Sequence, residues 1–254
     1  EVTDVTISKK AATGTDELPG AQVELICAGY DWSDILAADT DVSLNEDGTG
    51  ITWKSGTAPK TFTLKTGTYT LKETGAPNGY AYAEDIEFTV TNDHTVKING
   101  EELSDTTVVM KDNAVGIQIS KRDAGGQELP DAELSLYRTT DADGKPLAEE
   151  VLVKSWTSGS TPLTISEGVI AGASYRLKED TEPAGYKKAS DITFTLDKYN
   201  NIKDVTGGDY DAETGAVVMI DYDAEKGKAE ISKTSLNSSE LIGGAELAVY
   251  KAED

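Results

Sequence analysis

The sequence predicts an all-β protein made of antiparallel β-sandwich domains set end to end. Short runs rich in Val, Ile, Thr, Tyr and Phe alternate apolar with polar residues, as at 85–90 and 191–196, and Gly, Asn and Asp clusters separate them. The order of these runs also repeats along the chain. Such alternation turns one face of each strand toward a core and the other toward water, which is typical of a sandwich or partly open barrel.

Three sequence markers recur in the same order. They are Ile-Ser-Lys, then Tyr-x-Leu-Lys-Glu with a Pro-x-Gly-Tyr turn, then Val-Val-Met-x-Asp. The first marker occurs at 7–9, 119–121 and 231–233. The second occurs at 69–80 and 175–186, and the third at 108–112 and 217–221. A repeat of 112 residues with several strand patterns is a whole domain rather than a solenoid turn.

We therefore expect domain 1 at residues 1–113, domain 2 at 114–226 and the truncated start of a third domain at 227–254. The pattern is unfinished at its end, which suggests a piece of a longer chain. Few residues separate consecutive units, so the domains should form a semi-rigid rod.

Composition disfavours several classes of function. The chain has 46 acidic and 23 basic residues, and its net charge of −23 repels nucleic-acid phosphates and anionic membranes. No apolar run approaches the roughly 20 residues needed to span a bilayer. The single cysteine, Cys27, excludes an intrachain disulfide and is expected to be a small inward-pointing core residue.

No metal or cofactor is expected. The only histidine, His94, lies in a turn-like stretch without a nucleophile or second ligand beside it. The acidic loops lack the spacing of an EF-hand calcium site, so turn formation explains their Asp and Gly residues better.

A lysine, a glutamate and an aspartate continue apolar rows in each unit. Alternate residues of a strand share a face, so a charged residue that continues an apolar row faces the core. The rows are Val5, Ile7 and Lys9; Tyr69, Leu71 and Glu73; Val108, Met110 and Asp112; then Ile117, Ile119 and Lys121; Tyr175, Leu177 and Glu179; Val217, Met219 and Asp221. A buried charge must pair, lose its charge or react. The rows therefore indicate either a buried salt-bridged triad or a reacting one.

The sequence resembles the CnaB, or SpaA-type, domains of Gram-positive pilins and surface adhesins over nearly its whole length. The resemblance rests on Ile-Ser-Lys followed by Glu-Leu-Pro-Gly-Ala, on the block at 69–80, and on the closing strand that ends at Asp112. It implies an Ig-like or prealbumin-like antiparallel β-sandwich fold. It also implies an extracellular, cell-wall-anchored location.

In these domains a first-strand lysine condenses with an Asn or Asp of the last strand, and a glutamate assists. The resemblance implies two isopeptide bonds with their catalytic glutamates: Lys9 to Asp112 with Glu73, and Lys121 to Asp221 with Glu179. Burial favours this chemistry because it lowers the pKa of a lysine and raises that of a carboxylic acid.

Three positions qualify this assignment. Asn113 is an alternative acceptor to Asp112, but it has the opposite strand parity, and the second unit has Tyr222 at that place. Extra acidic residues at 180 and 182 crowd the glutamate turn of the second unit. Lys233 of the third unit lacks a glutamate and an acceptor, so it should be unreacted.

The resemblance implies a structural stalk or pilin-like module that is not an enzyme with turnover, since each bond forms once. Its partners would be further domains of the same surface protein, and sortase-linked pilus subunits or a host ligand. An alternative is a ligand-binding adhesin using loops such as 29–50, in which residues 33–39 suggest a short helical turn. A third hypothesis is an accessory part of a secreted enzyme. The acidic loops lack an aromatic-rich cluster or a convergent catalytic set, which disfavours both alternatives.

Overall fold

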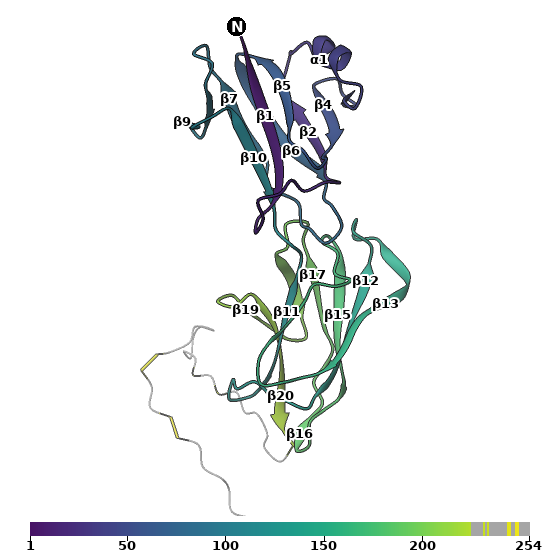
Figure 1. Cartoon of the computed structure of the whole chain (residues 1–254). Helices are drawn as coiled ribbons and strands as arrows, with labels where there is room; N and C mark the ends of the chain where they lie inside the picture. The colour runs from purple at the N-terminus through teal and green to yellow at the C-terminus, as the bar shows by residue number, and fades with distance from the viewer. Residues whose placement is uncertain (225–230, 232, 234–242, 245–246, 249–254) are drawn as a thin grey trace, which may run out of the picture.

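The computed structural model describes residues 1–224, 231, 233, 243–244 and 247–248, so most of the expected third domain lies outside the described residues. The described chain forms two β-sandwich domains, one following the other along the molecule (Figure 1). The prediction of tandem all-β sandwiches is confirmed. None of the helices in the described part of the chain has the length and apolar character needed to cross a membrane.

The first domain has two sheets, with strand orders β10-β1-β5 and β3-β4-β2-β6-β7-β8-β9. Its elements are β1 (Val2–Ala11), β2 (Gln22–Ile26), α1 (Ser33–Ala38), β3 (Ser43–Leu44), β4 (Gly50–Lys54), β5 (Lys60–Lys65), β6 (Gly67–Gly75), β7 (Ile86–Val90), β8 (Val96–Ile98), β9 (Glu101–Glu102) and β10 (Thr107–Asp112). The helical turn expected at 33–39 is α1.

The second domain repeats this plan with strand orders β13-β12-β15-β17-β18 and β14-β11-β20-β16, and β19 also pairs with β20. Its elements are β11 (Ile117–Asp123), β12 (Glu133–Thr140), β13 (Pro146–Thr157), β14 (Leu163–Ile165), β15 (Ser174–Thr181), β16 (Tyr186–Lys187), β17 (Ile192–Leu196), β18 (Ile202–Thr206), β19 (Asp209–Asp211) and β20 (Ala216–Asp223). Only residues 113–116 separate β10 from β11.

The first and last strands of each domain pair in parallel. Lys9 of β1 lies opposite Met110 of β10, and Lys121 of β11 lies opposite Met219 of β20. The other named pairings of the described strands are antiparallel. The alternation of side chains does not reveal this difference, because it is the same in both kinds of pair.

The predicted apolar rows face the two cores. In β6, Tyr69, Leu71 and Glu73 are buried, whereas the residues between them are partly exposed. Tyr69 stacks on Phe88 with ring centroids 5.4 Å apart, and Tyr175 stacks on Phe194 at 5.6 Å in the second domain. Equivalent aromatic pairs therefore fill equivalent places in both sandwiches.

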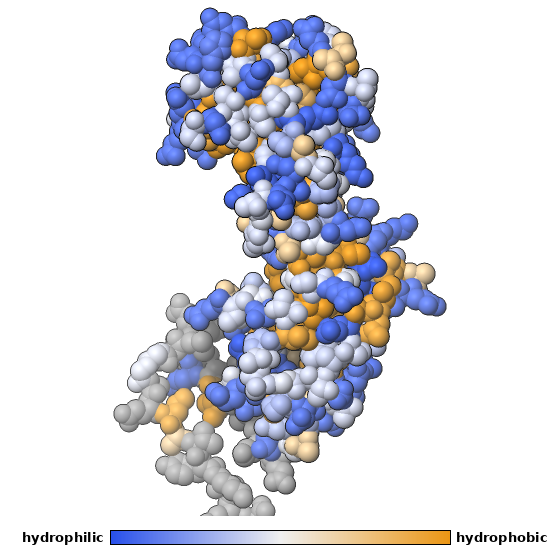
Figure 2. All heavy atoms as spheres, viewed as in Figure 1, coloured by the Kyte–Doolittle hydropathy of each residue, from blue (hydrophilic) through white to orange (hydrophobic). Residues whose placement is uncertain are grey.

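The domains differ at the edge of the larger sheet. In the first domain the two-residue strand β3 pairs with β4 and forms the edge. In the second, β13 is the last strand of its sheet and exposes Val151 (45%) and Leu152 (52%). Figure 2 shows apolar atoms gathered on this side of the second domain.

Candidate lysine–carboxylate centres

The parallel pairing of β1 with β10 brings Lys9 and Asp112 to the same end of the first domain. Lys9 lies opposite Met110, and Asp112 follows Met110 by two residues. Residues two apart on a strand share a face, so both side chains point into the sandwich. β6 supplies Glu73 from the facing sheet, where it continues the row of Tyr69 and Leu71.

These three groups meet in the first domain. Lys9 Nζ lies 3.1 Å from Glu73 Oε1 and also contacts Asp112 Oδ1. The exposed fraction is 4% for the lysine side chain and 0% for each carboxylate side chain. The backbone N–H of Ala83 donates to Glu73 Oε2 at 2.7 Å, which leaves Oε1 directed at the lysine.

The second domain repeats the arrangement with its own residues. Lys121 Nζ lies 3.0 Å from Glu179 Oε1 and contacts Asp221 Oδ1, and the exposed fractions are 2%, 0% and 0%. The backbone N–H of Ala189 donates to Glu179 Oε2 at 2.6 Å. All six predicted residues therefore lie in two buried centres of the same geometry.

Burial favours the protonated form of the carboxyl groups. It raises the pKa of Glu73 to about 7, and the nearby charge of Asp112 adds to this rise, while the Ala83 hydrogen bond and Lys9 oppose it. It also raises the pKa of Asp112, and that of Asp221 to about 6. Burial thus favours the protonated form of these carboxyl groups at a pH where an exposed aspartate has already lost its proton.

The residue next to Asp112 has a different environment. Asn113 is exposed, and its backbone carbonyl accepts a hydrogen bond from Ala81 at 2.9 Å. Asp112 is completely buried beside the lysine. Strand parity thus separates the two candidate acceptors as expected from the sequence.

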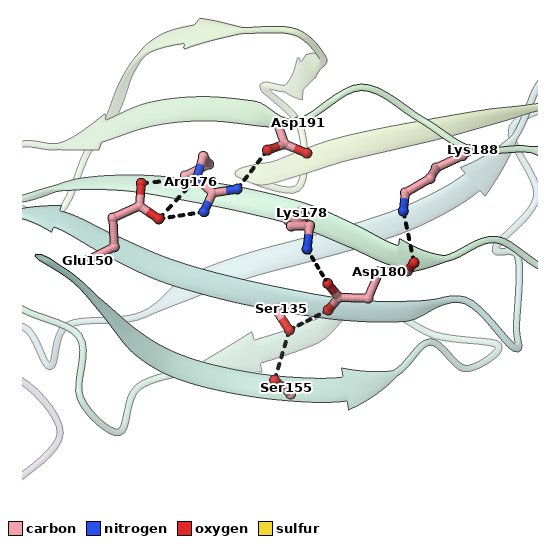
Figure 3. A network of polar contacts seen from close by, with 8 residues as sticks. All are labelled: Ser135, Glu150, Ser155, Arg176, Lys178, Asp180, Lys188 and Asp191. Atoms are coloured by element: carbon pink, nitrogen blue, oxygen red, sulfur yellow. Dashed lines mark hydrogen bonds and ion pairs between the residues drawn. The ribbon is translucent and has the colours of Figure 1, made fainter.

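The extra acidic groups of the second domain do not crowd its centre. Asp180 Oδ2 accepts from Ser135 at 2.5 Å, and Asp180 Oδ1 lies 2.8 Å from Lys178 Nζ. Figure 3 shows this network, in which Ser135 also contacts Ser155. Glu179 and Asp180 are neighbours in one strand and so point to opposite faces, and Glu182 is exposed.

Sequence reasoning missed a second carboxylate beside each lysine. Glu17 accepts from Ser8 Oγ at 2.5 Å and from the backbone N–H of Lys9 at 2.9 Å. Glu128 contacts Ser120 in the equivalent place. The available signal was the dipeptide Glu-Leu, which begins eight residues after Lys9 in the first domain and seven residues after Lys121 in the second. No sequence pattern pointed to the backbone N–H groups of Ala83 and Ala189 as donors, because nearly every residue has a backbone N–H.

A surface pocket reaches the lysine in both domains. In the first it is lined by Lys9, Glu17, Trp53 and Met110 among others. In the second, Lys121 contributes to an equivalent pocket with Glu128 and Trp156. The pocket therefore borders the lysine of each centre on the side of Glu17 in the first domain and of Glu128 in the second.

The remaining chemically active residues lie elsewhere. His94 has a φ of 59° in its turn, and its Nδ1 lies 3.0 Å from the carbonyl of Val2. Cys27 is half-buried beside the first core, and burial raises the pKa of its thiol. Among the described residues, no three His, Cys, Asp or Glu side chains are arranged to hold a metal ion. Lys233 is exposed.

Fold and site together define a protein of tandem β-sandwich domains, each with a buried lysine between two carboxyl groups. The family model of the SpaA domain, described as a prealbumin-like fold domain, matches residues 3–103 and 115–211. The chain belongs to this family. No curated protein sequence matches the chain.

Solved structures with similarity to the chain include three pilus proteins. The C-terminal fragment of the pilus adhesin SpaC from Lactobacillus rhamnosus GG is 16% identical with a TM-score of 0.38, covering 87% of this chain and 97% of that one. The shaft pilin spaA from the same organism is 15% identical with a TM-score of 0.32, covering 90% and 100%. A streptococcal ancillary pilin is 19% identical with a TM-score of 0.35, covering 89% and 63%.

Proposed function

We propose that each domain matures by joining its buried lysine to its buried aspartate through an isopeptide bond. The bonds are Lys9 to Asp112, assisted by Glu73, and the equivalent Lys121 to Asp221, assisted by Glu179. The observation that carries this proposal is the contact of each lysine Nζ with an aspartate Oδ1, in a centre where both carboxylate side chains are fully buried.

The chemistry follows from the groups in contact. The neutral amine of Lys9 attacks Cγ of the protonated Asp112, and the new N–C bond replaces the bond from Cγ to the hydroxyl oxygen. Glu73 accepts a proton from Nζ and delivers a proton to the departing hydroxyl, which leaves as water. Atoms balance without a cofactor, because one amine and one carboxylic acid give one amide and one water.

Positioning supplies much of the rate. The fold holds the reacting atoms in contact in a water-poor centre, where the entropy of bringing them together is already lost. The reaction occurs once per domain, so the glutamates act in maturation and not in turnover.

The parallel pairing of the first and last strands gives the bond a mechanical role. A force enters domain 1 at the start of β1, passes along the strand to Lys9, and would cross the bond to Asp112 where β10 ends. The chain between these residues then lies outside the load path. We infer that the protein is a stalk or pilin-like module that resists extension and proteolysis.

Location and partners extend this proposal. We expect a Gram-positive cell surface, with anchoring to the cell wall. Partners would be further domains of the same protein and sortase-linked pilus subunits. The loop at 29–50, considered above as a ligand site, buries Trp32, Ile35 and Val42 in the core, which favours the structural role.

An intact-mass measurement of the full chain tests the bonds. We expect the mass of the sequence less two waters, and less one water in Glu73→Gln. Lys10→Ala is a matched control, because this neighbouring lysine points away from the centre, and it should retain both losses. A full sequence mass in the wild type would contradict the proposal.

A further inference from the structure

The segment from Tyr80 to Ala83, here called the joint segment, belongs to both domains. Ala81 is 1% exposed and packs in the core of the second domain. Ala83 is 9% exposed and packs in the core of the first. Between them, the backbone N–H of Tyr82 donates to the carbonyl of Lys198 at 2.9 Å. The second sandwich therefore holds the segment at Ala81, and the first sandwich holds it at Ala83.

The turn of the second domain that meets the joint segment is itself held in place. Within that domain, the side chain of Asn200, at a φ of 67°, accepts from the backbone N–H of Gly116 at 3.0 Å. Lys198 Nζ lies 5.5 Å from the ring centroid of Tyr82, within the range of a cation–π contact. Asn200 and Lys198 come from the turn between β17 and β18, so this turn is the docking element of the second domain.

The joint segment also holds the glutamate of the first centre. The Ala83 N–H that donates to Glu73 Oε2 lies two residues after the buried Ala81. Tyr82 Oη donates to the carbonyl of Thr74, the residue after Glu73, at 3.3 Å. Displacement of the segment would therefore move the donor that directs Glu73 at Lys9.

The second domain holds its own glutamate differently. Lys187 and Lys188 stand where the first domain has Ala81 and Tyr82, and both are exposed. Lys188 Nζ donates to the carbonyl of Asp180 at 2.8 Å, in place of the Tyr82 bond to Thr74 (Figure 3). Lys188 thus makes in the second domain the contact that Tyr82 makes in the first.

We propose that docking of the second domain on the joint segment positions Glu73 for the condensation of Lys9 with Asp112. The inference rests on the proposed function and adds a dependence of one domain's maturation on the next. Ala81 and Ala83 are positioning residues that act through Glu73. Glu179 of the second centre does not contact the joint segment, because the Ala189 N–H and the Lys188 contact with Asp180 hold it.

The first test compares bond formation in two variants of the full chain, isolated unfolded and unreacted in denaturant and then diluted. Ala81→Lys introduces the residue that the second domain has and should disturb docking. Lys187→Ala is the matched control at the exposed equivalent place. Digestion and mass spectrometry follow each cross-linked peptide with time.

We expect Ala81→Lys to slow the Lys9 bond at least about fivefold, since loss of alignment slows a positioned reaction steeply. The bond of Lys121 should keep its wild-type rate in the same molecules, and Lys187→Ala should slow neither. Equal rates for the Lys9 bond in Ala81→Lys and wild type would overturn the inference. Absence of both bonds in the wild type would instead overturn the proposed function.

Coupling between two sites is reciprocal, so if the joint segment positions Glu73, Glu73 also stabilises the joint segment. The second test measures that stabilisation. Glu73→Ala and Glu73→Gln both prevent the bond, but glutamine keeps an acceptor for the Ala83 N–H. Hydrogen exchange of the Tyr82 amide, followed by NMR, should be about tenfold faster in Glu73→Ala than in Glu73→Gln, as for an opening energy lowered by about 1.4 kcal/mol. Equal exchange in the two variants would show that Glu73 does not hold the joint.

Discussion

The two domains share a buried centre and the sandwich around it, and they differ in the contacts that support the centre from outside. Both hold a lysine between an aspartate and a glutamate, and both fix the glutamate with a backbone N–H. Their edge strands, glutamate turns and carboxylates beside the lysine differ. The comparison teaches that a buried triad of a lysine and two carboxyl groups constrains the strands that carry it, whereas its outer supports can change.

The largest expected effect tests whether the two centres contribute equally to stability. Asp112→Ala and Asp221→Ala should each remove one of the proposed bonds, whose lysine and aspartate are 103 and 100 residues apart. In the chain-entropy model a bond closing such a loop stabilises by about 4.7 kcal/mol, so the two losses should be nearly equal. Denaturant unfolding of each variant, followed domain by domain with hydrogen exchange, measures them. Asn113→Ala is the control and should cost little; a loss as large as that of Asp112→Ala would reassign the acceptor.

The carboxylates beside the lysines, Glu17 and Glu128, should contribute unequally to the stability of their domains. Glu17→Ala leaves the backbone N–H of Lys9 without its acceptor and should destabilise the first domain by about 1–3 kcal/mol. Glu128→Ala should cost less, because Arg122, which contacts Glu128 at 3.3 Å, keeps Asp211 at 2.9 Å. Denaturant unfolding measures both losses of stability, as shifts of the transition midpoint with an unchanged dependence of the unfolding free energy on denaturant concentration. A greater loss in Glu128→Ala would contradict this ranking.

The dependence of maturation on pH should follow the protonated aspartate that the amine attacks. Burial raises the pKa of Asp112 above its ordinary value and that of Asp221 to about 6. As pH rises through the raised pKa of each aspartate its proton is lost, so bond formation should slow with rising pH in both domains, and in the second domain above about pH 6. Cross-linked peptides from chains diluted out of denaturant at a series of pH values measure both rates. A rate that increases through this range in either domain would contradict a role for the protonated group.

The smallest effect concerns the turn after the glutamate. Asp180→Thr gives the second domain the residue found in the first, and Thr74→Asp makes the reverse exchange. Since the ion pair of Asp180 with Lys178 is partly exposed and the buried Ser135 keeps its contact with Ser155, we expect a change below about 1 kcal/mol in unfolding free energy and full formation of both bonds. Intact mass and thermal unfolding are sufficient to test this. Loss of the second bond in Asp180→Thr would mean that the outer network supports the centre.

Much of the architecture was predictable because strand periodicity is a local property. A period of two placed Lys9 and Glu73 on core faces, and recurrence of the same pattern indicated a second sandwich. The parity of Asp112 and Asn113 likewise distinguished a buried carboxylate from an exposed amide.

The sequence by itself determined which residues would be buried, and with them the six members of the two centres. The tertiary structure decided that the first and last strands run in parallel, which brings Lys9 and Asp112 to the same end of the sandwich. It also decided which backbone N–H holds each glutamate and which domain secures the joint segment. Side-chain alternation is set within one strand, whereas strand direction and backbone partners depend on segments far apart in the chain, so only the folded molecule could fix them.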